Sequence, residues 1–577
     1  MEFQPLKPQL PHIPDDLTIG QFVFDHAHAV RPKEKPGTPW LIEDATGRSI
    51  GKEELRERTS CLAKALRYKY NVGEDDVVLL FSRNHIDYPV AIWAVHQLGA
   101  IISGANPDYA ENELLYQLQA TKATILIAHP DVLSVAEAAS RQYGLSSERL
   151  LVFNTSTSKN QTKITSIEDV IQLGRTHAPS TFQERKLKPG EGKTKLAFLS
   201  FSSGTTGRPK AVAIPHYSPI ANVIQIVVHN RVHEEYCAFE DRRYRPGDVA
   251  LAVLPFYHIY GLVINLHCLL FSGMSLVVVP KFNFVQMLES IVRYKISHLL
   301  IVPPMVVLLC KHPAVKNYDI RKSVRMIMSG AAPLSHELNQ QLFHMLPDAH
   351  IGQAYGMTET CTASTMWSLD RKRGVSGGSG TLLPGTIARI IKPDGTLAGY
   401  DEPGELWIFS PSNALGYLNN EEATRETFVD GWVRTGDEAK IRPDGEVFIL
   451  DRLKEIMKVK GFQVAPAELE GCILEHKDVD STCVVGVPDE YSGEVPMAFV
   501  ALRVDAAKRI EGDPREADGI KASIMKHVAE NKVAYKHLAG GVEFVDVVPV
   551  SPSGKLLRRV LRERARAMKQ REIKAKL

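Results

Sequence analysis

Hydrophobic and polar positions alternate along the first 350 residues with two periods, one helical and one extended. Between 52 and 70, leucines recur at helical spacing, and residues 88–98 predict a second helix. Apolar runs at 77–81 and 123–128 are each typical of a buried strand. Helical and extended segments that take turns in this way predict layered α/β subdomains.

The pattern changes twice further along the chain. From 375 to 450, glycines, prolines and short alternating runs predict a smaller β-rich subdomain. After Asp451 the alternation restarts, and it predicts a compact α+β unit with helices at 465–475 and 519–531 and strands at 481–487 and 497–504. We therefore predict a large N-terminal domain over 1–450, a hinge at 451–454 and a small C-terminal domain over 455–577.

The composition is that of a soluble protein with more than one domain, and it does not indicate a particular function. A chain of 577 residues is too long for one core, and 44% hydrophobic with 24% charged residues is ordinary for a soluble protein. A net charge of +2 gives no reason to expect nucleic acid. Seven cysteines without a C-x-x-C pair predict reduced thiols in an intracellular compartment. The N-terminus lacks the pattern of a signal peptide.

One strongly apolar stretch, from 251 to 280, has the length of a membrane span. Pro255, His258 and Gly273 interrupt it. We therefore predict a buried strand, a loop and a helix in a large core, and no membrane span.

The segment richest in chemistry follows an apolar run at 196–201. Glycines let backbone amides approach a phosphate, hydroxyls donate hydrogen bonds to it, and cations neutralise it. The segment contains all three kinds of residue: Ser202, Ser203, Gly204, Thr205, Thr206, Gly207, Arg208, Pro209 and Lys210. Its spacing differs from the common P-loop, and the alternative is a flexible Ser/Gly linker.

Four later clusters carry further polar chemistry, although each also has an ordinary structural explanation. Residues 353–359 combine an aromatic ring, a hydroxyl and a carboxylate, or form a turn. Thr435-Gly436-Asp437 places a carboxylate after a tight turn. Residues 451–462 are dense in charge, as in a solvated helix or linker. Residues 551–555 present one lysine on a Pro/Gly turn.

Taken together and in this order, these motifs resemble the AMP-forming adenylate family. That family holds acyl- and aryl-CoA ligases, luciferases and the adenylation domains of peptide synthetases. The resemblance runs from about residue 20 to about 560. Within the family, the 4-coumarate–CoA ligase-like group is most similar, including fungal peroxisomal phenylacetate-type ligases, on the segments 256–260, 329–334 and 460–470.

The resemblance implies a site for ATP and Mg²⁺ in the large domain. The 202–210 loop would hold the β- and γ-phosphates, Thr358 would contact the α-phosphate, and Glu359 would bind Mg²⁺. The ribose would lie on Asp437 and Arg452. The residues implied to bracket the adenine, or to lie beside them in the nucleotide site, are Gly330, Ala331, Ala332, Gln353, Tyr355 and Gly356.

The resemblance also implies a small domain that moves about a hinge containing Lys454 and presents two faces in turn. In the first step Lys555 would bridge the substrate carboxylate and the α-phosphate. After the turn, Lys458 and Gln463 would lie near the adenylate, while Gly461 and Phe462 edge the tunnel for coenzyme A. His258 would close the acyl pocket and assist the second step, and the implied lining of that pocket is Ile259, Tyr260, Val263, Leu300, Met328, Ala354 and Cys361.

The predicted function is a CoA ligase that converts a carboxylic acid to its CoA thioester through acyl-AMP and releases AMP and pyrophosphate. The alternatives are an adenylation enzyme that loads a carrier protein in trans and a luciferase-like oxidative enzyme. No carrier domain follows Lys555, since only a short tail remains.

The acid itself stays open among phenylacetate, cinnamates, benzoates and fatty acids. Members that bind coumarate carry an Asn and a Lys where this chain has Val263 and Met328, and a Gly-Pro-Val-Leu run near 361–364, where it reads Cys-Thr-Ala-Ser. Valine and methionine cannot hydrogen-bond a phenol, so we expect a weaker preference for 4-hydroxylated cinnamates.

The final three residues, Ala575-Lys576-Leu577, resemble the Ser-Lys-Leu peroxisomal address. We therefore expect a peroxisomal import receptor as a partner, and a cytoplasmic location if the signal is not read.

Overall fold

The computed structural model describes residues 1–576 except 7–8, 155–163, 177–181, 203–208, 332–333, 335, 454, 460–461, 490–491, 514 and 552–555. Several predicted site residues therefore lie outside the described part of the chain. They are Ser203, Gly204, Thr205, Thr206, Gly207, Ala332, Lys454, Gly461 and Lys555.

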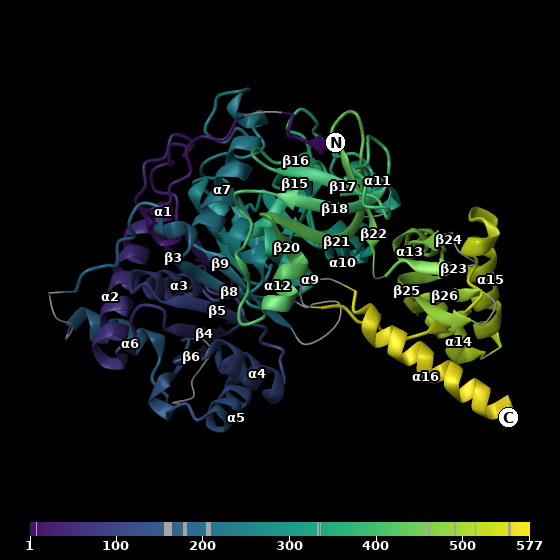
Figure 1. Ribbon diagram of the computed structural model, residues 1–577, viewed down its shortest axis with the longest axis horizontal. Coiled ribbons are helices and arrows are strands. Elements are labelled where there is room, and N and C mark those ends of the chain that lie inside the picture. Colours follow the sequence, from purple (N-terminus) through teal and green to yellow (C-terminus); the bar gives the residue numbers. More distant parts are fainter. Residues whose placement is uncertain are drawn as a thin grey trace.

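Two mixed sheets form the frame of the large domain (Figure 1). One has seven strands in the order β19-β9-β8-β5-β4-β6-β7. The other has nine strands in the order β16-β15-β14-β13-β12-β10-β11-β2-β3. The strands of the first are β4 (Val77–Phe81), β5 (Ile101–Ala105), β6 (Ile125–Ala128), β7 (Leu150–Val152), β8 (Leu196–Ser202), β9 (Lys210–Pro215) and β19 (Gly416–Tyr417). Those of the second are β2 (Leu41–Glu43), β3 (Ser49–Ile50), β10 (Val249–Ala252), β11 (Ser275–Val278), β12 (His298–Ile301), β13 (Met326–Ser329), β14 (His350–Met357), β15 (Thr362–Met366) and β16 (Thr381–Leu382).

Helices of two kinds surround these strands. Helix α3 (Tyr88–Gln97), α7 (Tyr217–His229) and a π-helix (Tyr260–Cys268) are buried along almost their whole length and belong to one core with both sheets. A helix that is apolar on every side is stable only in such a position. The others are α1 (Ile19–Phe24), α2 (Lys52–Tyr70), α4 (Glu111–Thr121), α5 (Leu133–Tyr143), α6 (Ile167–Thr176), α8 (Leu269–Phe271), α9 (Phe284–Tyr294), α10 (Pro303–Lys311) and α11 (His336–Met345).

The predicted β-rich subdomain is a third sheet, in which all pairings are antiparallel. Its order is β1-β17-β18-β21-β20, with β22 paired to β21. One face of this sheet is buried, as its alternating apolar and polar positions predict. The elements are β1 (Glu2–Phe3), β17 (Ile387–Ile391), β18 (Gly404–Phe409), β20 (Phe428–Val429), β21 (Trp432–Ile441), β22 (Val447–Arg452) and α12 (Glu421–Thr427).

The C-terminal unit stands to one side of the large domain and has a sheet of its own (Figure 1). Helices α13 and α15 cover one face of this sheet, and α16 packs on the other face against β25, so two separate cores flank it. The elements are β23 (Met457–Val459), β24 (Phe462–Val464), β25 (Val479–Asp489), β26 (Gly493–Leu502), β27 (Val542–Phe544), α13 (Pro466–Leu474), α14 (Val504–Gly512), α15 (Glu516–Asn531) and α16 (Arg558–Lys576).

The predicted α/β class is confirmed, and the predicted helices and strands are present, with two corrections. Thr435-Gly436-Asp437 does not follow a tight turn but lies inside β21. The charge-dense run after 450 is no helix: Asp451 and Arg452 complete β22, and residues 457–464 contribute two paired strands. Sequence reasoning was wrong here because Asp451 and Arg452 pair with Glu438 and Asp437, partners that no local pattern reveals.

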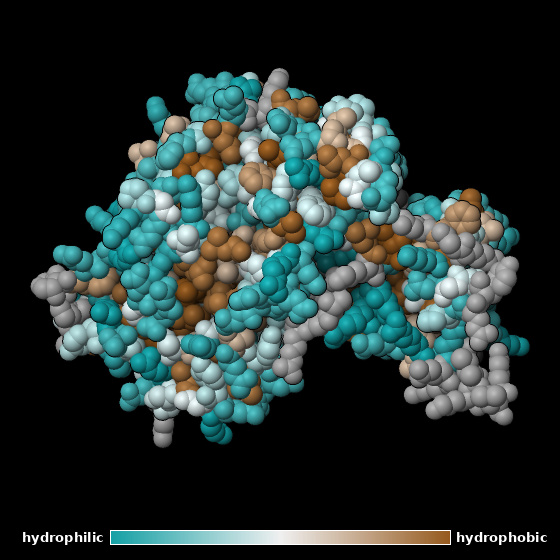
Figure 2. Space-filling model, viewed as in Figure 1, coloured by the Kyte–Doolittle hydropathy of each residue, from teal (hydrophilic) through white to brown (hydrophobic). Residues whose placement is uncertain are grey.

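The apolar stretch at 251–280 contains β10, the π-helix, α8 and β11, all inside the core. Among the described residues, no helix is long and apolar enough to cross a membrane. All seven cysteines are unpaired thiols. On the face shown in Figure 2, hydrophilic residues cover most of both domains, and apolar residues gather in a few hollows.

Candidate functional site

The two ends of the predicted phosphate loop lie opposite each other. Ser202 ends β8 and Lys210 begins β9, and the two are register partners in this antiparallel pair. The loop between them is therefore a hairpin connection that leaves and re-enters the sheet at one point, although residues 203–208 themselves are outside the described part. The Lys210 ammonium lies 5.0 Å from the centroid of the Tyr417 ring.

Glu359 links Ser202, at the start of this loop, to the turn that follows β14. Its side chain is buried in the 3₁₀ turn Thr358–Thr360 that follows β14. Oε1 accepts hydrogen bonds from the Ser202 hydroxyl at 3.0 Å and from the Tyr417 hydroxyl at 2.8 Å. A buried carboxylate needs such partners, and two donors on one oxygen leave Oε2 directed elsewhere.

Tyr417 is a site residue that sequence reasoning missed. It lies in β19, which pairs with β9 so that Tyr417 faces Val212 across the ladder. Burial, and then the nearby charge of Glu359, raise the pKa of its phenol, which therefore stays a hydrogen-bond donor. Its segment contains no motif, and only the pairing of strands about 200 residues apart brings it to the site.

The predicted ribose contacts form a second polar cluster. Asp437 is buried on β21, and its Oδ2 accepts a hydrogen bond from the Tyr355 hydroxyl at 2.6 Å. Arg452 approaches the other oxygen, with Nε 3.3 Å from Oδ1. The backbone amide of Asp437 donates to the Thr435 hydroxyl at 3.1 Å. The structure thus unites two residues predicted for the ribose with one predicted for the adenine.

Electrostatics explains the stability of this cluster. Burial lowers the pKa of Arg452, but Asp437, Tyr355, Glu455 and Glu359 together outweigh burial, so the net shift is upward. Burial and the same carboxylate raise the pKa of Tyr355. The ion pair and the phenol hydrogen bond are therefore both retained across the physiological range.

Strand β14 connects the two clusters. It carries Tyr355 at the ribose end and runs into the turn with Glu359 at the phosphate end. Between them, a Cβ on Gly356 would lie 1.5 Å from the carbonyl oxygen of Thr362, so only glycine lets β14 and β15 approach this closely. The close approach of the two strands therefore explains why residue 356 is glycine, and its role in the nucleotide site stays a prediction.

The predicted adenine segment follows β13. Ala331 adopts a left-handed backbone with φ 72°, which is uncommon without glycine and is frequent at functional sites. Gln353 uses its amide on the protein itself: Oε1 accepts from the Leu334 amide at 2.8 Å, and Nε2 donates to the Gly378 carbonyl at 3.0 Å. Gln353 therefore shapes this segment by tying its two sides together.

The predicted acyl-pocket residues form part of the main apolar cluster of the large domain, which extends across both of its large sheets. Leu300 and Met328 are register partners on β12 and β13, and the Tyr260 hydroxyl donates to the Met328 carbonyl at 3.2 Å. All of the predicted lining belongs to the main core or packs against it: Ile259, Tyr260, Val263, Leu300, Met328, Ala354 and Cys361. His258 is half-buried beside them, and its Nδ1 accepts from the Tyr260 amide at 3.3 Å.

The small domain contributes a hairpin. Lys458 on β23 and Gln463 on β24 are backbone register partners in this antiparallel pair. The Lys458 side chain is exposed, and its amide donates to Glu494 at 2.9 Å. Phe462 is 54% exposed and stacks on Tyr535 with ring centroids 4.4 Å apart.

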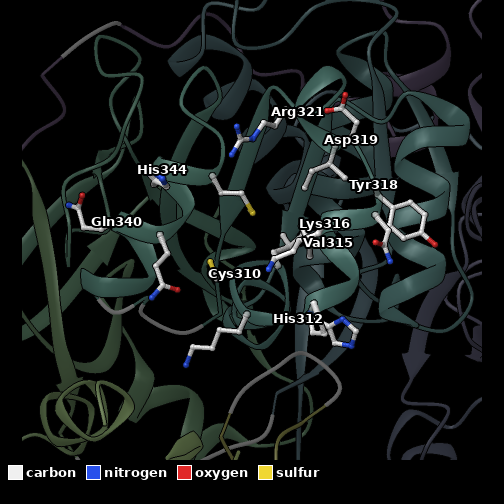
Figure 3. Close-up of a pocket in the computed structure, with 16 residues that line it drawn as sticks. Cys310, His312, Val315, Lys316, Tyr318, Asp319, Arg321, Gln340 and His344 are labelled. Atoms are coloured by element: carbon white, nitrogen blue, oxygen red, sulfur yellow. The ribbon is translucent and has the colours of Figure 1, made fainter. Parts of the chain in front are cut away.

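A cavity of about 1040 Å³ lies away from these clusters, between the end of α10 and α11 (Figure 3). Its described lining mixes apolar side chains with Lys311, Lys316 and Arg321, and contains none of the predicted site residues.

Comparisons with known proteins agree with the geometry. The model of the AMP-binding enzyme family matches residues 28–418, and that of the AMP-binding enzyme C-terminal domain matches 468–555. The chain is 35% identical over 569 residues to 4-coumarate–CoA ligase 2 of Oryza sativa subsp. japonica, covering 96% of this chain and 94% of the relative. It is 34% identical over 578 residues to acyl-CoA ligase AFT1-1 of Alternaria alternata, covering 96% of each.

Solved structures give the same fold. The anthranilate CoA ligase AuaEII in complex with anthranoyl-AMP is 23% identical, with a TM-score of 0.80 over 98% of this chain and 99% of that one. ATP-bound MatB from Rhodopseudomonas palustris is 24% identical, with a TM-score of 0.78 over 95% of this chain and 99% of that one.

The chain therefore belongs to the AMP-binding enzyme family. Within it, the chain is an ATP-dependent CoA ligase, an acid–thiol ligase that works through an acyl-AMP. The fold class and the function predicted from sequence are thus confirmed, whereas the individual residue roles and domain boundaries remain predictions.

Proposed function

We propose that this ligase activates a mainly apolar aryl or acyl carboxylic acid, with Mg²⁺-bound ATP held along β14 and Lys555 brought in by the small domain. The observation that carries the proposal is the convergence of polar residues from distant segments. Ser202, Glu359 and Tyr417 meet at one end of the site. Asp437, Tyr355 and Arg452 meet at the other.

The arrangement matches the order of groups in ATP. The Asp437 carboxylate suits the two ribose hydroxyls, because an ionised carboxylate accepts from both. The hairpin that begins at Ser202 and ends at Lys210 supplies hydroxyls, amides and a cation for the β- and γ-phosphates. The α-phosphate then falls between the clusters, near Thr358.

The buried carboxylate of Glu359 is a suitable ligand for Mg²⁺. This hard cation keeps several waters and binds one or two carboxylates plus substrate phosphates. Glu359 supplies one buried carboxylate whose Oε2 is directed away from Ser202 and Tyr417. No group of three or more acidic, His or Cys side chains suited to a metal occurs in the described part of the chain. When bound, Mg²⁺ would offset phosphate charge at the reacting centre.

The first step joins two anions. A carboxylate oxygen attacks the α-phosphorus, the new C–O–P bond forms, and pyrophosphate leaves. The ammonium of Lys555, between the carboxylate and the α-phosphate, would reduce their repulsion where charge develops. Lys210 at the end of the hairpin would stabilise the departing pyrophosphate.

The second step exchanges AMP for the thiol. The sulfur of coenzyme A, having lost its proton, attacks the acyl carbon, and the bond to AMP breaks. Much of this step is positioning. His258 lies beside the acyl cluster, and the hairpin with Lys458, Gln463 and Phe462 would flank the adenylate and the tunnel once the small domain has turned.

The apolar cluster supports a preference for acids without a 4-hydroxyl group. Val263 and Met328 are fully buried and offer no side-chain hydrogen bond to a phenol. An unsatisfied buried hydroxyl costs about 1–3 kcal/mol, so discrimination of roughly tenfold or more against 4-coumarate is expected.

The purified protein should be incubated with ATP, Mg²⁺ and coenzyme A against phenylacetate, cinnamate, 4-coumarate, benzoate and fatty acids. The proposal expects AMP and thioester in equal amounts, with kcat/KM for cinnamate above that for 4-coumarate. Reactions without coenzyme A provide the matched control, since they stop at acyl-AMP. AMP formation without any thioester would instead favour an enzyme that loads a carrier protein or oxidises the adenylate. A preference for 4-coumarate over every other acid would refute the inference that the pocket disfavours a 4-hydroxyl group.

We also propose that Ala575-Lys576-Leu577 directs the enzyme to peroxisomes through the import receptor. A fluorescent protein fused in front of the chain should co-localise with a peroxisomal marker. Deletion of Leu577 should return the fusion to the cytoplasm. An unchanged distribution after the deletion would contradict the assignment.

A further inference from the structure

A buried ionic cluster lies at the start of α16, just after the predicted catalytic loop. Arg558 follows Lys555 by three residues in the sequence. Its side chain is only 12% exposed and donates to two carboxylates. Nη1 reaches Glu455 Oε2 at 2.8 Å, and Nη2 reaches Glu470 Oε2 at 2.5 Å.

The two carboxylates come from different places. Glu455 follows directly on the predicted hinge at 451–454, and Glu470 lies in α13. Glu470 is also fixed from the other side, because its Oε1 accepts from the Val484 amide of β25 at 2.8 Å. Arg558 thus links α16 to the exit of the hinge and to the sheet at once.

The charges hold this cluster together. Burial opposes the charge of Arg558, but Glu470 and Glu455 outweigh burial and raise the pKa of the guanidinium. A guanidinium presents a rigid fork of donors that can hold two carboxylates in fixed directions. Removing one partner of such a buried set leaves an uncompensated charge, so its geometry is strongly constrained.

The hinge and α13 are joined in the same region. The amide of Ala467, in the first turn of α13, donates to Asp451 Oδ2 at 3.1 Å. Hydrogen bonds of 3.1 Å or less therefore connect the entry to the hinge, α13 and α16 through Asp451, Ala467, Glu470 and Arg558.

The base of the catalytic loop is closed on the same side. Val550 and Leu556 form an antiparallel bridge, and the Leu557 amide donates to the Pro549 carbonyl at 2.9 Å. Val550 and Leu556, which lie on either side of the loop with Lys555, are therefore held side by side, and Leu556 comes two residues before Arg558. Whatever fixes Arg558 also fixes the base of that loop.

We propose that Arg558 is a positioning residue for the first half-reaction: its ion pairs to Glu455 and Glu470 set the base of the 551–555 loop relative to the hinge, so that Lys555 reaches the reacting carboxylate. The inference deepens the proposed function and depends on it. Displacement of a catalytic group by about 1 Å can cost roughly 100-fold in rate. A loosened Arg558 should therefore impair adenylation and spare the second step, which does not use Lys555.

The variant Arg558→Lys tests this, because one ammonium keeps the charge but cannot hold two carboxylates in the same fork. We expect acyl-AMP formation, measured by pyrophosphate exchange, to fall about 30- to 100-fold in kcat, with the KM for ATP within about two-fold. Thioester formation from supplied acyl-AMP should stay within about two-fold. Glu455→Gln should give the same split, and the double variant should lose little more than either single one.

Arg559→Lys is the matched control, since Arg559 is 71% exposed and pairs with Glu563 one turn along the same helix. It should leave both half-reactions unchanged. Equal loss of both half-reactions in Arg558→Lys and Glu455→Gln, or no loss of adenylation in protein with unchanged Tm, would overturn the proposal. Lys555→Ala in the same assay separates the two ideas: if it adenylates normally, the assignment of Lys555 fails, and with it the reason for positioning the loop.

Discussion

Replacing Lys555 with alanine should lower the rate of acyl-AMP formation by about 10²- to 10³-fold while thioester formation from supplied acyl-AMP stays within about two-fold of wild type. The reason is electrostatic. One ammonium offsets the repulsion between the substrate carboxylate and the α-phosphate, and groups aimed at developing charge contribute on the order of 3–4 kcal/mol. In the proposed mechanism the second step uses another face of the small domain, so the lysine would take no part in it. Pyrophosphate exchange measures the first step, and coenzyme A consumption from synthetic acyl-AMP measures the second.

Gly461→Leu is the mirror-image control for this result. A leucine side chain at the predicted edge of the coenzyme A tunnel should block the second step and leave adenylation intact. If both variants lose both half-reactions together, the division of labour between two faces of the small domain is wrong.

Replacing Glu359 with glutamine should have the second large effect. The amide keeps the size of the side chain and can still accept from Ser202 and Tyr417, but it removes the charge that attracts Mg²⁺. We expect the Mg²⁺ concentration for half-maximal adenylation to rise at least tenfold, with kcat about 10²-fold lower at saturating metal. Initial rates over a Mg²⁺ titration at fixed ATP check this.

Tyr417→Phe provides the companion variant. It removes one neutral hydrogen bond to Glu359 and leaves the carboxylate charge in place. A loss of only about two- to tenfold is expected, with little change in the Mg²⁺ requirement. A Mg²⁺ dependence of Glu359→Gln that matches wild type would show that Glu359 orients the Ser202 end of the loop and does not bind metal.

Local patterns predicted those parts of the site that are contiguous in sequence. The buried strand ending at Ser202, the carboxylate of Asp437 and the cluster around Tyr355 and Glu359 all carry their signal within a few residues. Ser202 ends β8, and Glu359 lies in the turn after β14, where polar side chains leave the sheet and a motif stays intact in the fold. Asp437 is different, because it lies inside β21 and not after a turn.

Contacts between residues far apart in the sequence could not be predicted from local sequence patterns. Tyr417 reaches Glu359 only because β19 pairs with β9, and Arg452 reaches Asp437 only because β22 pairs with β21. The identity of the acid is hidden for another reason. Val263, Leu300 and Met328 have the composition of any core, so their burial does not distinguish a pocket wall from simple packing.

The small domain has apolar cores on both faces of its own sheet. The small domain could therefore be exchanged as a unit with the corresponding domain of a relative, because the exchange would cut through neither of those cores. The junction matters more than the interior. Since Ala467 donates to Asp451, a chimera whose crossover lies before Asp451 would carry that contact across as a matched pair. If the proposed roles hold, with the acid selected by the large domain and the thioester step served by the small one, the two properties could then be recombined as separate traits.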